Sequence, residues 1–159
     1  MSHTVSCTNG CCTLDIGEYK PTNLITDRNR NKKAGCLLYD KKEDMVLLIQ
    51  SRGNLWGAPK GSLEQQETAV NGAIREVLEE TGIEITRDML GSSITIDNKA
   101  TYFMVHHDKC DVSIQSNLIN NDANAIGWIK PRCIQQLATN NVIKLTKHTE
   151  MILSHFLSI

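Results

Sequence analysis

Residues 61–83 read GSLEQQETAVNGAIREVLEETGI, and this stretch places three glutamates on one side of a predicted helix. On a helix that advances about 100° per residue, Glu79 and Glu80 lie one turn beyond Glu76, so the three carboxylates converge on one patch. An oxygen-only ligand set suits a hard divalent cation such as Mg²⁺ or Mn²⁺, and Mg²⁺ commonly takes further ligands from substrate phosphates. The patch therefore predicts a site for metal and phosphate.

The same stretch predicts how the helix packs and where it ends. Val70, Ile74 and Val77 recur at helical spacing on a different face from the glutamates. We expect this face to dock on a core while the acidic stripe stays accessible. Glycine just past a helix end is a common cap, so Gly82 predicts the end of the helix.

Spacing distinguishes this stretch from an ordinary charged helix, because an isolated E-x-x-E-E is usually solvated surface charge. The residues at fixed intervals are Gly61, Glu67, Arg75, Glu76, Glu79, Glu80, Gly82 and Ile83. This ungapped pattern resembles the complete Nudix box of the Nudix hydrolases. The resemblance is strict over residues 61–83 and looser from about residue 34 onward, and it does not cover the first 25 or so residues. It implies an α/β Nudix fold, in which a mixed β-sheet is sandwiched between α-helices (an α/β/α sandwich).

The resemblance also implies roles for the box residues. The backbone carbonyl of Gly61 and the carboxylates of Glu76, Glu79 and Glu80 would hold Mg²⁺ (or Mn²⁺). Arg75 and Glu67 would form a structural pair. That pairing makes physical sense by itself, because a guanidinium beside crowded carboxylates offsets their repulsion and can fix their rotamers through bidentate hydrogen bonds.

Such a site is suited to hydrolysis of a diphosphate linkage, which needs a nucleophilic water, a base and cations on the phosphoryl oxygens. In related enzymes the base is a glutamate of the box or a carboxylate from a downstream loop, so Glu79 and Glu80 both remain candidates. Between His106 and Trp128 the chain has aspartates but no glutamate. Asp122 is the best placed loop carboxylate, although it could equally punctuate an Asn-rich turn.

The residues before the box suggest substrate contacts. Trp56 and Lys60 belong to a Trp-Gly-x-Pro-Lys-Gly lead-in that is similar to mRNA-decapping catalytic subunits and to asymmetric diadenosine tetraphosphate hydrolases. Lys60 could neutralise a phosphate, and Arg52 is a further candidate. Trp56 could stack on a base, but a tryptophan is more often a core anchor. Diphosphoinositol hydrolases more often have glycine at the position of Lys60, which disfavours that substrate class.

Charge is distributed unevenly along a chain whose net charge is −1. Residues 60–88 carry seven acids against three bases, whereas residues 123–149 carry four bases and no acid. Lys144 and Lys147 lie in this basic part, on a predicted C-terminal helix whose apolar side runs from Val142 to Phe156. The basic side could contact an RNA backbone, or it could be a solvated face of a packed helix. A second cluster precedes the first predicted strand and says little by itself: Arg28, Arg30, Lys32 and Lys33.

The chain of 159 residues, with 40% hydrophobic residues, predicts one globular domain at residues 26–159 after an N-terminal extension at residues 1–25. Periodicity predicts a hairpin of residues 34–39 and 45–52. Further strands are predicted at residues 83–85, 92–96, 100–107 and 126–129, and a helix from Pro131 toward Leu137.

The longest aliphatic run, residues 45–49, is far shorter than the roughly 20 residues of a membrane span. Because the N-terminus also lacks an apolar signal core, we expect an intracellular, cytoplasmic protein with no membrane contact. Free thiols are then the default for the six cysteines. The exception is a set of four potential soft ligands, His3, Cys7, Cys11 and Cys12, which could bind zinc although they lack a paired C-x-x-C spacing.

Together these features predict a Mg²⁺-dependent Nudix pyrophosphohydrolase that acts on a nucleoside diphosphate linked to another moiety. The favoured substrate is the 5′ cap of mRNA, followed by dinucleoside polyphosphates such as diadenosine tetraphosphate and then by diphosphoinositol polyphosphates. A different class also remains, namely a catalytically weak Nudix module that binds RNA or nucleotides. The oligomeric state is not indicated by the sequence.

Overall fold

The computed structural model describes residues 3–16, 32–51, 55–115 and 123–159. Its main feature is an eight-stranded mixed sheet. Six of the strands lie in the order β10-β5-β4-β3-β8-β7, and the other two, β6 and β9, pair with β3 and β4. The strands are β3 (Lys33–Asp40), β4 (Met45–Ser51), β5 (Leu55–Gly57), β6 (Lys60–Ser62), β7 (Leu90–Ile96), β8 (Ala100–His106), β9 (Ala123–Ile129) and β10 (Lys144–Leu145). The helices are α1 (Ala69–Thr81), α2 (Pro131–Thr139) and α3 (Lys147–Leu157), with a 3₁₀ turn at Arg87–Met89.

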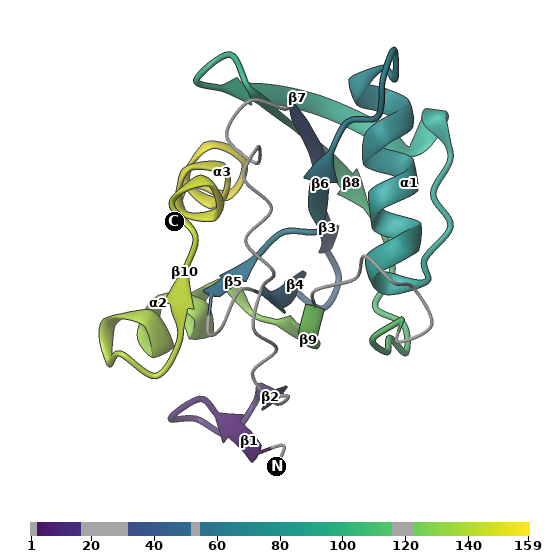
Figure 1. Ribbon diagram of the computed structural model, residues 1–159. Coiled ribbons are helices and arrows are strands. Elements are labelled where there is room, and N and C mark those ends of the chain that lie inside the picture. The colour runs from purple at the N-terminus through teal and green to yellow at the C-terminus, as the bar shows by residue number, and fades with distance from the viewer. Residues whose placement is uncertain (1–2, 17–31, 52–54, 116–122) are drawn as a thin grey trace.

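Helices cover both sides of this sheet. In Figure 1, α1 lies on one side, and α2 and α3 lie on the other. The core between these layers consists of apolar side chains with 1% exposure or less, among them Leu37, Leu38, Val46, Leu47, Leu48, Trp56, Val77, Val105, Ile129 and Ile152. This arrangement confirms the predicted α/β fold, a mixed sheet between helices. No helix among the described residues is long and apolar enough to cross a membrane.

Strands β3 and β4 separate soon after the turn that joins them. Only Tyr39 and Asp40 of β3 pair with β4, and the rest of β3 runs parallel to β8. At the far end, β3 pairs with β6 while β4 pairs with β5. The short connection between β5 and β6, which contains Ala58 and Pro59, therefore spans the gap between the two diverging strands.

Gly35 is the residue that lets this connection approach β3. A Cβ at Gly35 would lie 2.3 Å from the Pro59 carbonyl oxygen and 2.7 Å from Lys60 Cβ. The backbone N–H of the next residue, Cys36, donates to the same Pro59 oxygen at 3.1 Å. A side chain at position 35 would thus push away the segment that carries Lys60 and Gly61.

The N-terminal hairpin packs against the domain. Strands β1 (His3–Ser6) and β2 (Thr13–Ile16) are antiparallel, and β2 lies against β9. Leu14 of β2 is 1% exposed, and a Cβ at Gly127 of β9 would lie 2.6 Å from its Cδ2. The predicted boundary between residues 25 and 26 falls outside the described residues, so it stays a prediction.

Most predicted elements are confirmed, but two are wrong. The hairpin of β3 and β4, the strands at β7, β8 and β9 and the helix from Pro131 are all present. Residues 83–85 form no strand, although Ile83 and Ile85 are buried. The C-terminal helix begins only at Lys147, because Lys144 and Leu145 instead form β10, which pairs in parallel with β5. Val142, placed on the apolar side of that helix, is 43% exposed.

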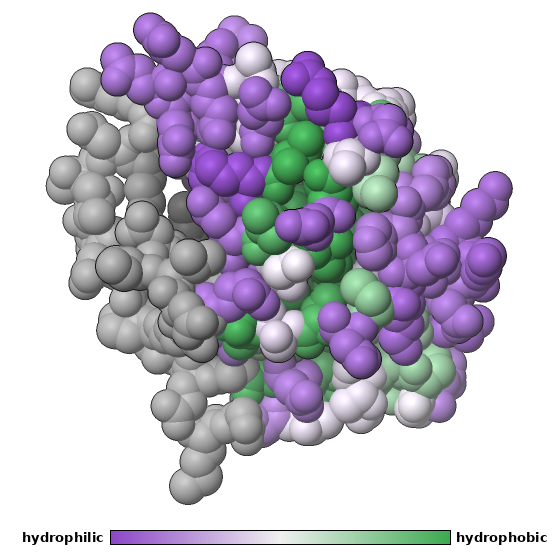
Figure 2. Space-filling view, turned by 90° about the vertical axis from the view of Figure 1, so that its right-hand side faces the viewer, coloured by the Kyte–Doolittle hydropathy of each residue, from purple (hydrophilic) through white to green (hydrophobic). Residues whose placement is uncertain are grey.

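The face on the α1 side of the molecule is not uniformly polar. Figure 2 shows hydrophobic residues in a vertical band through the middle of this face, with hydrophilic residues on both sides. Leu78 of α1 and Met89, which follows the helix in sequence, are 42% and 41% exposed. Exposed apolar side chains therefore occur on α1 and just after it in sequence.

We predict that Gly35→Ala destabilises the protein by about 2 kcal/mol, because the added methyl group collides with a backbone carbonyl rather than with a mobile side chain. Urea unfolding measures this loss. An unfolding midpoint equal to that of the native chain would show that the Pro59–Lys60 segment does not depend on the close approach at Gly35.

Candidate active site

A cavity of about 380 Å³ opens where β3 and β4 diverge. Its wall on one side is acidic and comes from α1, and basic residues from β3 and β6 also line it. The charged lining residues are Lys33, Lys60, Glu64, Arg75, Glu76, Glu79 and Glu80. The structure therefore brings the three predicted glutamates, Arg75 and Lys60 to one cavity, together with the backbone of Gly61.

Arg75 is the centre of the acidic wall. Its Nε and Nη2 donate to the two oxygens of Glu67 at 2.9 and 2.8 Å, which makes the bidentate pair that was predicted. Its Nη1 donates to Glu76 at 2.8 Å and to Glu79 at 3.1 Å. Nη2 also donates to the Ser62 carbonyl at 2.9 Å. One guanidinium thus connects the loop before α1 with two box glutamates of the helix.

Glu67 belongs to the turn that starts α1. The side chain of Thr68 caps the helix by accepting from the Asn71 N–H, and Glu67 Oε1 accepts from the Glu64 N–H at 3.1 Å. Hydrogen bonds from Arg75 hold the pKa of Glu67 below its usual value. These carboxylates in turn raise the pKa of Arg75, with Glu67 the largest cause. The pair is therefore ionised on both sides at neutral pH.

Glu76 lies deeper than the predicted acidic stripe. It is 8% exposed and shares the buried side of α1 with Ala73 and Val77, which corrects the expectation of an acidic stripe separate from the docking face. Burial raises its pKa, and the charge of Arg75 opposes that rise. A Cβ at Gly61 would lie 2.1 Å from Glu76 Cδ, so only glycine allows the carboxylate to rest against the backbone there.

Glu80 connects the helix to the lead-in segment, since its Oε2 accepts from the Lys60 backbone N–H at 3.0 Å. Its charge, after burial, raises the pKa of Tyr102, whose hydroxyl lies 3.0 Å from His148 Nδ1. Burial and then the charge of Lys60 lower the pKa of His148, and Lys33 and Lys147 act in the same direction. Lysines from β3, β6 and α3 therefore act on His148, and two of them, Lys33 and Lys60, also line the cavity.

Two of the predicted substrate contacts have a different place in the structure. Trp56 is 0% exposed, so it cannot stack on a substrate base. It is a core residue, which was the other possibility that the sequence left open. Lys144 is exposed but lies on β10 rather than on the C-terminal helix, and Lys147 is exposed at the start of α3. Arg52 and Asp122 lie outside the described residues.

Lys33 and Thr146 are among the cavity residues that sequence reasoning missed. In the sequence, Lys33 belongs to a basic cluster that does not indicate a binding site. The pairing of Lys33 with Ser62 of β6 brings it to the box. Thr146 caps α3, and its hydroxyl contacts that of Thr149 at 2.7 Å. A Cβ at Gly57 would meet both hydroxyls, at 3.1 and 2.8 Å, so the helix end sits directly on β5.

The donor set fits a hard divalent cation. Three carboxylates and the Gly61 backbone line the same cavity, and the space that a Cβ would fill at Gly61 is occupied by the Glu76 carboxylate. Such oxygen donors suit Mg²⁺ or Mn²⁺ and not a thiophilic metal. Glu76, Glu79, Glu80 and the Gly61 carbonyl are the residues that could hold it.

Comparison with known proteins is consistent with this geometry. The NUDIX domain family matches residues 29–145. A protein of Invertebrate iridescent virus 3 that is named as hydrolase 111R is 31% identical over 159 residues, which covers 95% of this chain and 89% of the viral protein.

Two further relatives match over shorter segments. The m7GpppN-mRNA hydrolase dcap-2 of Caenorhabditis elegans is 45% identical over 53 residues, 31% of this chain and 7% of that protein. Human diphosphoinositol polyphosphate phosphohydrolase 2 is 39% identical over 72 residues, 42% of this chain and 40% of that protein. The chain thus spans less than half the length of each.

A solved structure shares the fold. The bifunctional NMN adenylyltransferase/ADP ribose pyrophosphatase of Francisella tularensis, complexed with AMP and a manganese ion, superposes with a TM-score of 0.62 at 19% identity. The match covers 80% of this chain and 41% of that one. At this identity the likeness concerns the fold alone.

Glu67→Gln should lower the free energy of unfolding by about 2 kcal/mol at neutral pH, because the charged bidentate partner of Arg75 is lost. The folded-state pKa of Glu67 lies below the ordinary value of 4.5, so its contribution is present above that value and is lost as pH falls through the folded pKa. Urea unfolding from neutral pH to about 3 measures the difference between variant and native chain.

Glu64→Gln is the matched control, since Glu64 lies 3.8 Å from the same guanidinium but its side chain is 70% exposed. It should change stability by less than about 1 kcal/mol. A Glu67→Gln difference that stays the same from neutral to acidic pH would contradict the proposed ion pair.

Gly61→Ala should weaken Mg²⁺ binding and turnover, each by about tenfold or more, because the methyl group displaces the Glu76 carboxylate from its place beside the backbone. Calorimetric Mg²⁺ titration and single-turnover kinetics measure the two effects. Ser62→Ala is the control, since the Ser62 carbonyl that accepts from Arg75 is retained. If Gly61→Ala binds Mg²⁺ as tightly as the native chain, Glu76 is not a metal ligand.

Proposed function

The chain belongs to the Nudix family and is a hydrolase of diphosphate linkages, and from this premise we propose that it is a Mg²⁺- or Mn²⁺-dependent decapping enzyme that cleaves the 5′ cap of mRNA. The observation that carries the proposal is the cavity itself, which the box carboxylates line together with Lys33 and Lys60. The carboxylates would bind the metal and the lysines would bind phosphate oxygens of the same diphosphate.

In this proposal the box residues hold the cation and activate water. Glu76, Glu79, Glu80 and the Gly61 carbonyl would hold the metal. When bound, a divalent cation neutralises phosphoryl oxygens and lowers the pKa of water. Glu79 or Glu80 removes the proton from the attacking water, and both carboxylates line the cavity. Arg75 positions Glu76 and Glu79 through Nη1 and does not itself react.

The basic residues bind the substrate's phosphates. Lys33 and Lys60 line the cavity, so their ammonium groups can neutralise the phosphates on either side of the bond that is cut. Lys147, at the start of α3, follows Thr146, which lines the cavity. Lys144 is exposed on the neighbouring strand β10. A long polyanion that enters the cavity can continue over these two lysines.

Capped RNA is the substrate that uses all of these contacts. A cap is a phosphoanhydride joined to a ribose-phosphate chain, so the cavity takes the anhydride and the basic exterior takes the chain. The lead-in from Trp56 to Gly61 resembles decapping subunits, and the local match to dcap-2 supports the same choice. Release of a nucleoside diphosphate that carries the cap base is the expected reaction.

Diphosphoinositol polyphosphates are the second candidate that an observation favours. Over 72 residues the chain is similar to the human diphosphoinositol polyphosphate phosphohydrolase, whose name states its activity. The two lysines that line the cavity also suit a compact polyanion. Lys60, where that branch more often has glycine, places this candidate behind capped RNA. Diadenosine tetraphosphate, suggested by the same lead-in as the cap, is the third substrate to compare.

We predict that, at one Mg²⁺ concentration, capped RNA of a few tens of nucleotides is hydrolysed faster than a cap dinucleotide analogue, diadenosine tetraphosphate or a diphosphoinositol. Replacing both Lys144 and Lys147 by glutamate should slow capped-RNA hydrolysis by about tenfold and affect the analogue much less. Lys41→Glu with Lys42→Glu, on the exposed turn between β3 and β4, is the matched control. Chromatography of the products identifies the bond that is cut.

Equal rates for capped RNA and cap analogue would contradict the role of the basic exterior, and preference for a diphosphoinositol would replace the proposed substrate. Glu79→Gln and Glu80→Gln test the alternative of a binding module. The variant that removes the base should lose at least about 10²-fold in turnover. If neither variant changes hydrolysis, the box does not perform the chemistry.

A further inference from the structure

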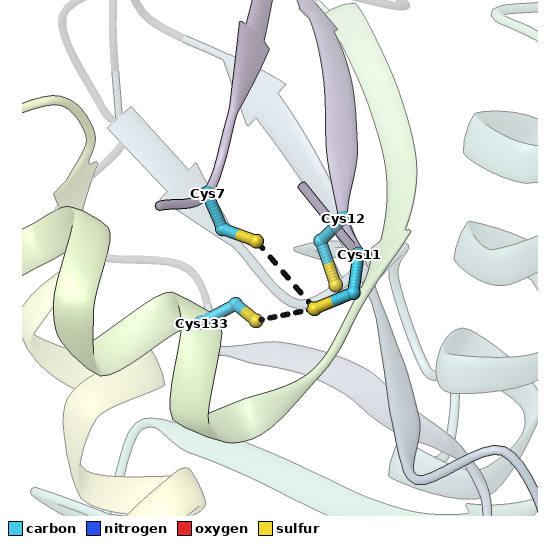
Figure 3. Close-up of side chains that lie close together, drawn as sticks. All are labelled: Cys7, Cys11, Cys12 and Cys133. Carbon is cyan, nitrogen blue, oxygen red and sulfur yellow. Dashed lines mark hydrogen bonds between the residues drawn. The ribbon is translucent and has the colours of Figure 1, made fainter. Parts of the chain in front are cut away.

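Four cysteines gather far from the cavity, at the junction between the N-terminal hairpin and α2. Their Sγ atoms, from Cys7, Cys11, Cys12 and Cys133, all lie within 4.8 Å of one another. Figure 3 shows the four side chains pointing toward one another, three from the hairpin loop and one from α2. None of these residues lines the cavity of the candidate active site.

We propose that these four cysteines form a structural zinc site that fastens the N-terminal hairpin to α2. With zinc–sulfur bonds of about 2.3 Å, the sulfurs of a tetrahedral site lie about 3.8 Å apart. Cys11 Sγ lies 3.5 Å from both Cys7 Sγ and Cys133 Sγ. Small side-chain rotations therefore convert the observed cluster into a tetrahedral site.

The backbone around the cluster is arranged as a ligand loop. Residues 7–12 connect β1 to β2, and the loop is closed by the Cys7 N–H donating to the Cys12 carbonyl and the Gly10 N–H donating to the Cys7 carbonyl, both at 3.0 Å. The Lys130 N–H donates to Cys12 Sγ at 3.3 Å. Hydrogen bonds of this kind orient ligands and stabilise bound thiolates.

Two positive features lie beside the cluster. Cys133 lies in the first turn of α2, where the helix dipole stabilises negative charge. Arg132, the residue before Cys133, is exposed and carries a positive charge. Four thiolates around one divalent cation carry two excess negative charges, and both features offset them.

Burial identifies the site as structural. Cys7, Cys12 and Cys133 are 4% exposed or less, and only Cys11 reaches the surface. Four protein ligands leave no position for a substrate, unlike a catalytic zinc site. A disulfide, the other use of neighbouring thiols, joins sulfurs in pairs, whereas Cys11 Sγ lies at the same distance, 3.5 Å, from both Cys7 Sγ and Cys133 Sγ.

The set differs from the one that the sequence suggested. His3 is exposed on β1 and is not among the clustered ligands, and Cys133 takes the fourth position instead. The zinc would then link residues 7–12 to residue 133, across the fold. A second contact supports this attachment, since the Thr8 N–H donates to Gln136 Oε1 of α2 at 3.2 Å.

The test is the metal content of the full chain, purified under reducing conditions with zinc in the growth medium. Mass spectrometry of the elements should find about one zinc per chain. Cys133→Ser should lose most of it. Cys110→Ser should keep it, because Cys110 lies outside the cluster and its carbonyl, which accepts from Trp128 Nε1, remains. Glu76→Gln should also keep it, which separates this site from the box.

Cobalt provides a second measurement that reports the ligand type. After zinc removal, Co²⁺ should give the visible and near-ultraviolet thiolate bands of a tetrahedral sulfur site. Cys11→Ser, at the exposed position, should fold and yet alter these bands, which keeps the test valid if Cys133→Ser does not fold. Native chain without zinc and without thiolate–cobalt bands would overturn the proposal. So would a disulfide between two of these cysteines, with no metal uptake after reduction.

Discussion

The Arg75 guanidinium is the interaction on which the candidate active site depends. Its donors reach Glu67, Glu76, Glu79 and the Ser62 carbonyl, all within 3.1 Å. Crowded carboxylates repel one another, and a fixed planar cation offsets that repulsion while setting their directions. The loop and the helix of the box therefore form one rigid unit, in which the glutamates are placed before any substrate arrives.

The sheet supplies the second half of the site. Because β3 and β4 pair only next to their turn, a cavity opens between them, and the segment from Ala58 to Gly61 crosses it. Two glycines leave room for close contacts. The Pro59 carbonyl lies where a Cβ of residue 35 would be, and the Glu76 carboxylate lies where a Cβ of residue 61 would be. Lys33 of β3 and Lys60 of β6 both line the cavity, and the antiparallel pairing of these two strands brings them there.

Local features could be predicted from the sequence, and features that depend on long-range pairing could not. The box helix and its Gly82 cap follow from the pattern within 23 residues, and the Arg75–Glu67 pair follows from the resemblance to the Nudix box. The apolar periodicity around Leu145 predicts a helix, yet pairing with Trp56 of β5 makes this residue part of a strand. Residues 83–85 have the composition of a strand but no pairing partner in the sheet. Cys133 and Lys33 are brought to their clusters by partners distant in sequence, which no local pattern reveals.

The central claim is that the carboxylates organised by Arg75 bind a divalent cation for diphosphate hydrolysis. A crystal soaked in Mn²⁺ and measured for anomalous scattering tests it most directly. The account predicts a peak in the cavity, bound by Glu76, Glu79 or Glu80 and by the Gly61 carbonyl. A saturating soak that leaves this position without a peak, or a peak bound only by residues outside the box, would contradict it.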